Sequence, residues 1–119
     1  MVIDLIEVPL SLTVYGHEHP IQPEASGKTI WVYDNPGTVF VGLEYTGPPP
    51  DLERKLVLLP RYLLAQHTGP YRDLPATYDL LRLALAEHGL RPLGVNVEIR
   101  GPERGADTEV DVLIGLARN

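Results

Sequence analysis

The sequence predicts an α+β domain that is built mostly from antiparallel β-strands. Short β-branched and apolar runs recur along the 119-residue chain, separated by Gly, Pro, Asn and Asp. One segment, from Leu74 to His88, instead carries apolar residues at helical spacing. The strand runs also recur in a similar order in the two halves of the chain, which suggests an internal repeat. These three observations together define the predicted fold class.

The strand predictions follow from β-branched composition and from turn chemistry. The predicted strands are Ile3 to Tyr15, Thr29 to Tyr33, Val39 to Tyr45, Leu56 to His67, Val95 to Arg100 and Thr108 to Ile114. Pro9 lies within the first of them, which favours an edge or a bulge because proline cannot donate to a strand ladder. The sequence Asp34-Asn35-Pro36-Gly37 favours a turn at every position and predicts a hairpin.

The predicted helix has recognisable signals at both ends. Asp73 is a favourable N-cap, and Pro75 lies in the first turn, where its missing N–H costs nothing. The apolar stripe consists of Leu74, Tyr78, Leu81 and Leu85, completed by Thr77, Ala84 and His88. Gly89 is placed to end the helix at the C′ position. We therefore expect a helix of about four turns in the second half.

The repeat is seen when the two halves are compared. Placing Pro9 on Pro60, an offset of 51 residues, matches Leu12 with Leu63. Placing Pro36 on Pro102, an offset of 66 residues, matches the two later hairpins. The difference between the two offsets is about the length of one helix. The chain is therefore interpreted as two tandem β-α-β-β-type repeats with pseudo-twofold symmetry, with the helix of the first repeat missing. Coincidental strand spacing in a mixed α+β domain is the alternative.

One domain is expected over residues 1–119. Repeat one covers about residues 1–47, the stiff proline-rich connector residues 47–52, and repeat two about residues 53–117. The stretch from Gln22 to Lys28 stands where the first helix would be. The sheet face of that half then lacks a cover within the chain, which predicts a homodimer in which a neighbour, or this stretch, supplies one.

Composition excludes several classes of protein. The net charge of −6 disfavours binding to phosphate backbones, so no direct nucleic-acid partner is expected. The absence of cysteine excludes disulfides, thiolate metal sites and cysteine nucleophiles. No apolar run approaches the ~20 residues that span a bilayer, and no secretory signal pattern is present. We expect a soluble, cytoplasmic protein without membrane partner, and no cofactor, because nucleotide-binding fingerprints are missing.

The second half resembles a known family. The motifs that carry the resemblance are Leu59-Pro60-Arg61-Tyr62, His67-Thr68-Gly69-Pro70-Tyr71, the helix with Tyr78 and Leu81, Gly89-Leu90, Gly94, Glu98-Ile99, and Thr108-Glu109-Val110-Asp111-Val112. In this order and spacing they resemble the second repeat of GyrI-like domains, which belong to the SOUL/BmrR effector-binding superfamily. The likeness covers roughly Leu56 to Leu116. In the first half only Tyr33 to Pro36 and the strand pattern support it.

The resemblance implies a ligand cleft between the two repeats, with an acidic residue at its centre that corresponds to Glu98. Family members bind drug-like, often cationic and aromatic, compounds. Some are effector domains of transcription regulators, some are stand-alone proteins that protect against toxins or gyrase inhibitors, and a few hydrolyse small electrophiles. This chain departs from the family pattern in two ways. Arg100 stands where an aromatic residue is usual, and the first helix is missing.

Glu98 is the principal candidate for a site residue. It lies between Val97 and Ile99 on a predicted strand, so its side chain shares a face with those of Asn96 and Arg100. In a partly dry cleft its carboxylate would attract a cation. The aromatic residues expected to line that cleft are Trp31, Tyr33, Tyr62 and Tyr71. The alternative is that Glu98 only pairs with Arg100 at the solvent, where such pairs are weak.

Three functions remain open from the sequence. The first is a stand-alone binding domain that binds or sequesters an amphipathic, cationic aromatic compound. The second is a hydrolase of small electrophiles that uses Glu98 as general base or nucleophile. The third is a homodimeric interaction protein without a small ligand. Binding is favoured over catalysis, and no metal site is expected, because His17-Glu18-His19 offers two imidazoles without a third ligand nearby.

Overall fold

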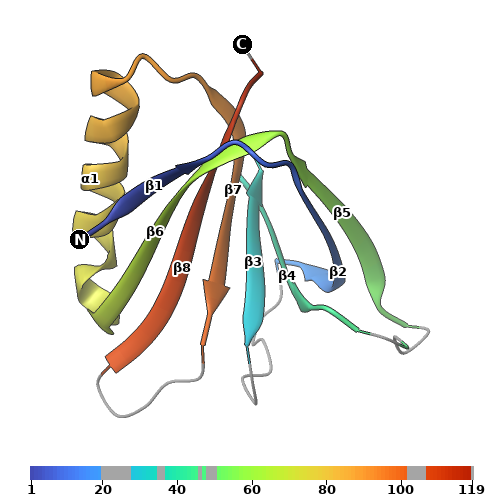
Figure 1. The fold of residues 1–119 in the computed structure, drawn as a ribbon. Helices are drawn as coiled ribbons and strands as arrows, with labels where there is room; N and C mark the ends of the chain where they lie inside the picture. The colour runs from blue at the N-terminus through green and yellow to red at the C-terminus, as the bar shows by residue number, and fades with distance from the viewer. Residues whose placement is uncertain (20–27, 35–36, 46, 48–50, 102–106, 119) are drawn as a thin grey trace.

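The protein forms one eight-stranded sheet with a single helix on one face among the residues described (Figure 1). The computed structural model describes residues 1–19, 28–34, 37–45, 47, 51–101 and 107–118. The elements are β1 (Ile3–Ile6), β2 (Leu10–Glu18), β3 (Thr29–Asp34), β4 (Thr38–Leu43), β5 (Glu53–Leu59), β6 (Arg61–Pro70), the 3₁₀ turn η1 (Tyr71–Asp73), α1 (Leu74–Glu87), β7 (Pro92–Arg100) and β8 (Asp107–Leu116). Every strand pair is antiparallel. The predicted α+β class is therefore confirmed.

The strand order across the sheet is β1-β6-β8-β7-β3-β4-β2-β5. The two long strands predicted from the sequence are each broken beside a proline, so the prediction of continuous strands from Ile3 to Tyr15 and from Leu56 to His67 is wrong. Pro9 separates β1 from β2, and Pro60 separates β5 from β6. Since each proline lacks a backbone N–H, the ladder stops there and the chain changes partner. As a result β1 pairs with β6 while β2 pairs with β5.

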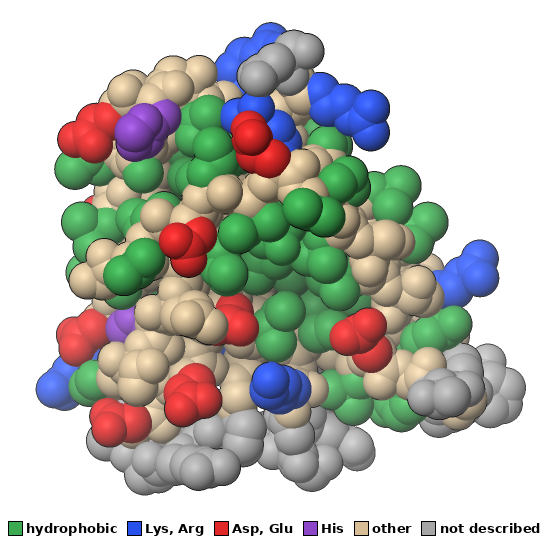
Figure 2. Space-filling view, viewed as in Figure 1, with side chains coloured by type: hydrophobic (Ala, Val, Ile, Leu, Met, Phe, Trp, Pro, Cys, Tyr) green, Lys and Arg blue, Asp and Glu red, His purple; other side chains and the backbone are tan. Residues whose placement is uncertain are grey.

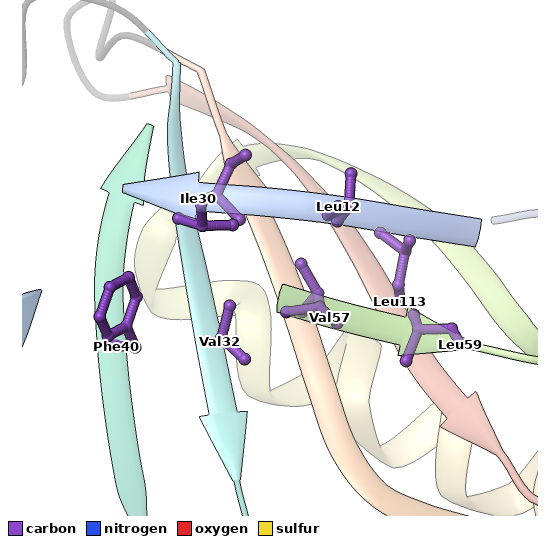
Figure 3. Packing of buried hydrophobic residues seen from close by; sticks show 9 residues of the cluster. Leu12, Ile30, Val32, Phe40, Val57, Leu59 and Leu113 are labelled. Carbon is purple, nitrogen blue, oxygen red and sulfur yellow. The ribbon is translucent and has the colours of Figure 1, made fainter. Parts of the chain in front are cut away.

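The sheet bends so that one of its faces encloses a hydrophobic core, here called the core face. Figure 3 shows labelled side chains from β2, β3, β4, β5 and β8 directed into one shared space. The buried members of this core are Leu12, Val14, Ile30, Val32, Phe40, Val57, Leu59, Val97 and Leu113. Burial of apolar surface on this scale is the main stabilising contribution in a small domain. It holds β3 and β7 side by side at the centre of the sheet.

The opposite face of β6 and β8 carries the helix and is here called the helix face. Alternate residues of β6 and β8 pack against α1, including Leu63, Ala65, Val110 and Val112. Leu81 of α1 is buried among them. The helix covers only this part of the sheet (Figure 1), so the same face continues beyond it onto β7 and β3.

The ends of the helix agree with the sequence signals in position. Asp73 is the N-cap residue, although its side chain makes no capping hydrogen bond. Gly89 follows the helix with a φ of 60°, a conformation that glycine adopts without strain. The Leu90 N–H donates to the Leu85 carbonyl oxygen at 3.0 Å, which completes a Schellman-type ending. The predicted helix is thus confirmed, and it begins and ends at residues that the sequence identified.

The register used to compare the two halves is wrong for β2 and β6. That comparison matched Leu12 with Leu63 and Val14 with Ala65. Leu12 and Val14 point into the core face, whereas Leu63 and Ala65 pack against the helix. Residues matched in that register therefore lie on opposite faces of the sheet, because side chains alternate along a strand. The stretch from Gln22 to Lys28 is expected in place of the first helix. Except for Lys28, this stretch lies outside the described residues.

Apolar side chains remain exposed both in the middle of one face and on the edge strand β5. Figure 2 shows apolar side chains gathered in the middle of the face seen in Figure 1, with acidic side chains spread among them. On edge strand β5, Leu56 and Leu58 are 58% and 61% exposed. An edge strand with apolar side chains is open to pairing with another chain. The homodimer expected from the sequence stays a prediction, which light scattering at high protein concentration can test.

Candidate functional site

Glu98 is the one buried acidic residue among the described part of the chain. The alternation of β7 places Val97 in the core and turns Glu98 to the helix face. There Glu98 stands opposite Trp31 of β3 on one side and Val112 of β8 on the other. Only 3% of the residue is exposed. A buried carboxylate needs compensating partners, because the loss of hydration of a charged group is costly.

Both carboxylate oxygens of Glu98 have partners. The Arg100 Nε–H donates to Oε1 at 2.9 Å, and Arg100 Nη2 forms an ion pair with the same oxygen at 2.8 Å. The Tyr78 hydroxyl of α1 donates to Oε2. The sequence left open a pairing of Glu98 with Arg100 at the solvent; the pair forms, but away from solvent, since the Arg100 side chain is only 19% exposed. Charge-assisted hydrogen bonds of this kind are stronger than those between neutral groups.

Aromatic rings surround the Arg100 guanidinium. Its Cζ lies 3.7 Å from the centroid of the Trp31 ring and 4.8 Å from that of the Tyr71 ring. Arg100 Nη2 also donates to the Tyr33 hydroxyl at 2.8 Å. The Trp31 indole N–H donates to Thr29 Oγ1 at 2.9 Å, which helps to fix the orientation of the ring. The guanidinium thus combines cation–π contacts with hydrogen bonds to a carboxylate and a phenol.

Four of the five ligand-binding residues expected from the sequence come together. Glu98, Trp31, Tyr33 and Tyr71 all contact or surround Arg100. Tyr62 does not join them, because on β6 it points to the core face and packs against the core. We call the assembled group of Glu98, Arg100, Trp31, Tyr33, Tyr71 and Tyr78 the aromatic ion-pair site.

Two members of this site were not assigned to it by sequence reasoning. The sequence identifies Arg100 only as a neighbour of Glu98, and Tyr78 only as part of the apolar helical stripe. Tyr78 lies where α1 meets the sheet. Its ring packs against the buried apolar residues between α1 and strands β6 and β8, here called the helix-side core, while its hydroxyl reaches Glu98. The sequence signal for the role of Tyr78 is its place within an apolar stripe, since a buried tyrosine hydroxyl normally finds a hydrogen-bond partner.

A buried histidine ties the start of α1 to β6 and so helps to place the tyrosines. His67 Nε2 lies 3.2 Å from the Pro70 carbonyl oxygen, and His67 Nδ1 lies 3.0 Å from Thr77 Oγ1. Because a carbonyl can only accept, Nε2 is the protonated nitrogen, and in the neutral ring Nδ1 accepts from the Thr77 hydroxyl. Along the chain Tyr71 directly follows Pro70, and Tyr78 directly follows Thr77.

The tyrosines of the site resist ionisation. Burial, reinforced by the nearby charge of Glu98, raises the pKa of Tyr33 to about 12, against the lowering effect of Arg100. Burial raises the pKa of Tyr71 as well. Burial and the hydrogen bond to Glu98 raise the pKa of Tyr78. At neutral pH these hydroxyl groups therefore remain protonated and act as hydrogen-bonding groups rather than as anions.

Alkaline pH is expected to weaken the fold through Tyr33. In the unfolded chain the phenol ionises near its ordinary pKa of 10.0, whereas the folded protein keeps the proton until its pKa of about 12. Between these values unfolding releases a proton, so stability falls as pH rises, by on the order of 1 kcal/mol for this half-buried group, because solvent screens part of the effect. Urea unfolding at pH 9 and pH 11 should show a smaller loss for Tyr33→Phe than for the wild type. Equal losses would rule out this contribution.

In the described ranges no group of three or more His, Asp or Glu side chains is placed to hold a metal ion. Nor does any described helix have the length and apolar character needed to cross a bilayer. Comparison of the sequence with known proteins gives no matching family model and no significant match among curated proteins.

Proposed function

We propose that the protein is a GyrI-like small-molecule-binding domain that binds an amphipathic, cationic aromatic compound at the aromatic ion-pair site. The observation that carries the proposal is the convergence of a buried carboxylate, an indole and three tyrosines on the helix face of β3 and β7. Aromatic walls with a few convergent polar groups are typical of small-molecule sites. Tyr71 is 43% exposed and provides a rim that a ligand can reach.

The charge and the rings of the site favour a cation. A carboxylate that is largely removed from water attracts a positive charge more strongly than an exposed one does. The face of a tryptophan ring adds cation–π attraction, and desolvation strengthens it. Glu98 and Trp31 are direct neighbours across the β7–β3 ladder and supply these two contributions side by side.

The order of the strands supports two related halves with a site between them. The strand order is β1-β6-β8-β7-β3-β4-β2-β5. If β1 is exchanged with β5, β2 with β6, β3 with β7 and β4 with β8, the result is the same order read backwards. The β7–β3 ladder lies at the centre of that exchange, and it carries Glu98, Arg100, Trp31 and Tyr33. This placement fits the cleft that the resemblance to GyrI-like domains implies. It thereby supports the proposed pseudo-twofold organisation.

Fluorescence titration tests the binding function, because Trp31 is the only tryptophan of the chain and lies in the site. Rhodamine 6G, a lipophilic aromatic cation, is expected to quench Trp31, and Glu98→Gln should weaken its binding by about tenfold through the lost charge. Tyr62→Phe, on the core face, serves as the matched control and should bind as the wild type does. Equal affinities of the wild type and Glu98→Gln would refute the role of Glu98.

A hydrolase is the second candidate, favoured by the hydrogen bond from Tyr78 to Glu98. A carboxylate beside a protonated phenol could act as nucleophile or general base, with the phenol as proton donor. Turnover of activated esters and of cyclopropyl electrophiles distinguishes this function from binding alone. A hydrolase should lose turnover in both Glu98→Gln and Tyr78→Phe. Turnover that persists unchanged in both variants, or none in the wild type, excludes it.

A further inference from the structure

The aromatic ion-pair site already contains a cation, which belongs to the protein itself. We infer that Arg100 is the resident occupant of the proposed ligand site and that a ligand binds by displacing it, so that the site selects planar cations with N–H donors, such as aryl guanidinium and amidinium compounds. This inference rests on the proposed binding function and names its ligand class. The contacts made by Arg100 carry it.

Each contact of Arg100 describes a requirement that the site places on an occupant. The stacking distances of 3.7 Å to the Trp31 ring and 4.8 Å to the Tyr71 ring require a flat group. The Nε and Nη2 contacts with Glu98 require N–H donors in or near that plane, together with positive charge. The Tyr33 hydroxyl, which accepts from Nη2, offers a further acceptor to an N–H group of the occupant. A guanidinium or amidinium group meets all of these requirements, whereas a quaternary ammonium group lacks the N–H donors.

While Arg100 stays in place, the Glu98 carboxylate already has a counter-ion and a hydrogen-bond partner on each oxygen. Its Oε1 accepts from Arg100 and its Oε2 accepts from Tyr78, and the residue is almost fully buried. Tyr78 extends from α1, which is held against the sheet by the helix-side core. Arg100 is the last residue of β7 and has a long, flexible side chain, so it is the partner that can leave.

Displacement has a consequence for affinity. A side chain tethered beside its own site competes at a high effective concentration, of the order of millimolar or above for short flexible tethers. The wild type should therefore bind free planar cations weakly, and removal of Arg100 should open the site without removing its rings or its carboxylate. Arg100 would then be a specificity-determining residue that admits only ligands able to replace its contacts.

Calorimetric titration of phenylguanidine into wild type, Arg100→Ala and Glu98→Gln/Arg100→Ala tests the inference. Arg100→Ala should bind phenylguanidine at least about tenfold more tightly than the wild type, as expected when a tethered competitor is removed. Its melting temperature should rise with added phenylguanidine. The double variant should lose both effects, and phenylurea, the neutral analogue of similar shape, should produce neither. Equal affinity of wild type and Arg100→Ala, or equal binding of phenylurea, would overturn the inference.

A second variant keeps the test valid if Arg100→Ala does not fold. Arg100→Lys retains a positive charge but has no flat group to stack, so phenylguanidine should displace the lysine more easily than the arginine and bind more tightly than to the wild type. No gain in this variant also counts against displacement. The outcome for the general function is separate: if rhodamine 6G binds to the wild type and phenylguanidine shows no gain in either variant, the binding function stands and the displacement is refuted.

Discussion

Arg100→Ala is expected to lower the free energy of unfolding by about 3–5 kcal/mol, the usual cost of removing one partner from a buried ion pair. The substitution leaves the Glu98 carboxylate buried with the Tyr78 hydroxyl as its remaining partner. It also removes the group that packs against the rings of Trp31 and Tyr71. Urea or thermal unfolding followed by circular dichroism measures the change.

An exposed ion pair in the same protein provides the matched control. Arg82 Nη1 lies 2.8 Å from Asp79 Oδ1 on α1, at the same distance as the closest Arg100–Glu98 contact, but both side chains are mostly in solvent. Arg82→Ala should therefore cost less than about 1 kcal/mol. Adding Glu98→Gln to Arg100→Ala should restore part of the lost stability, because the uncompensated charge is removed. A loss for Arg100→Ala no larger than that for Arg82→Ala would contradict the assigned burial of the pair.

Gly16→Ala is expected to destabilise the protein by about 3 kcal/mol or more, at the upper end of overpacking effects. Gly16 of β2 lies opposite Gly42 of β4. A Cβ atom on Gly16 would stand 1.9 Å from the Val41 carbonyl oxygen and 2.6 Å from the Gly42 Cα. Both neighbours are backbone atoms, so the two strands would have to separate. Chemical unfolding of the purified variant measures the loss.

Gly47→Ala is the corresponding control, because a Cβ at that position meets no atom of the described residues within 4 Å. Its effect should be within the range typical of surface substitutions, about 0.5 kcal/mol in either direction. If Gly16→Ala proved as mild as Gly47→Ala, the close approach of β2 and β4 would have to be revised. The close contact between β2 and β4 also holds the β3–β4–β2 half of the sheet together. Gly16→Ala should therefore also weaken any ligand binding at Trp31.

Local patterns were sufficient for much of the fold. The apolar stripe and Gly89 located the helix, and the alternation around Glu98 correctly placed its side chain on the same face as that of Arg100. These local patterns were not sufficient to predict where the strands end at the prolines. Pro9 indicated an interruption, but whether the strand bends or ends there depends on which strands lie alongside it. Pairing partners are set by long-range packing, which periodicity does not report.

For the site, the sequence by itself determined the residue types and, through the two-residue period of a strand, that Glu98 and Arg100 share a face. Only the tertiary structure decided that Trp31 of β3 and Tyr71 of η1 enclose the guanidinium, that Tyr78 of α1 bonds to Glu98, and that Tyr62 points to the other face. The physical reason is that side-chain direction follows from a few neighbouring residues. The meeting of β3, η1 and α1 at β7 instead depends on how the whole sheet bends around its core.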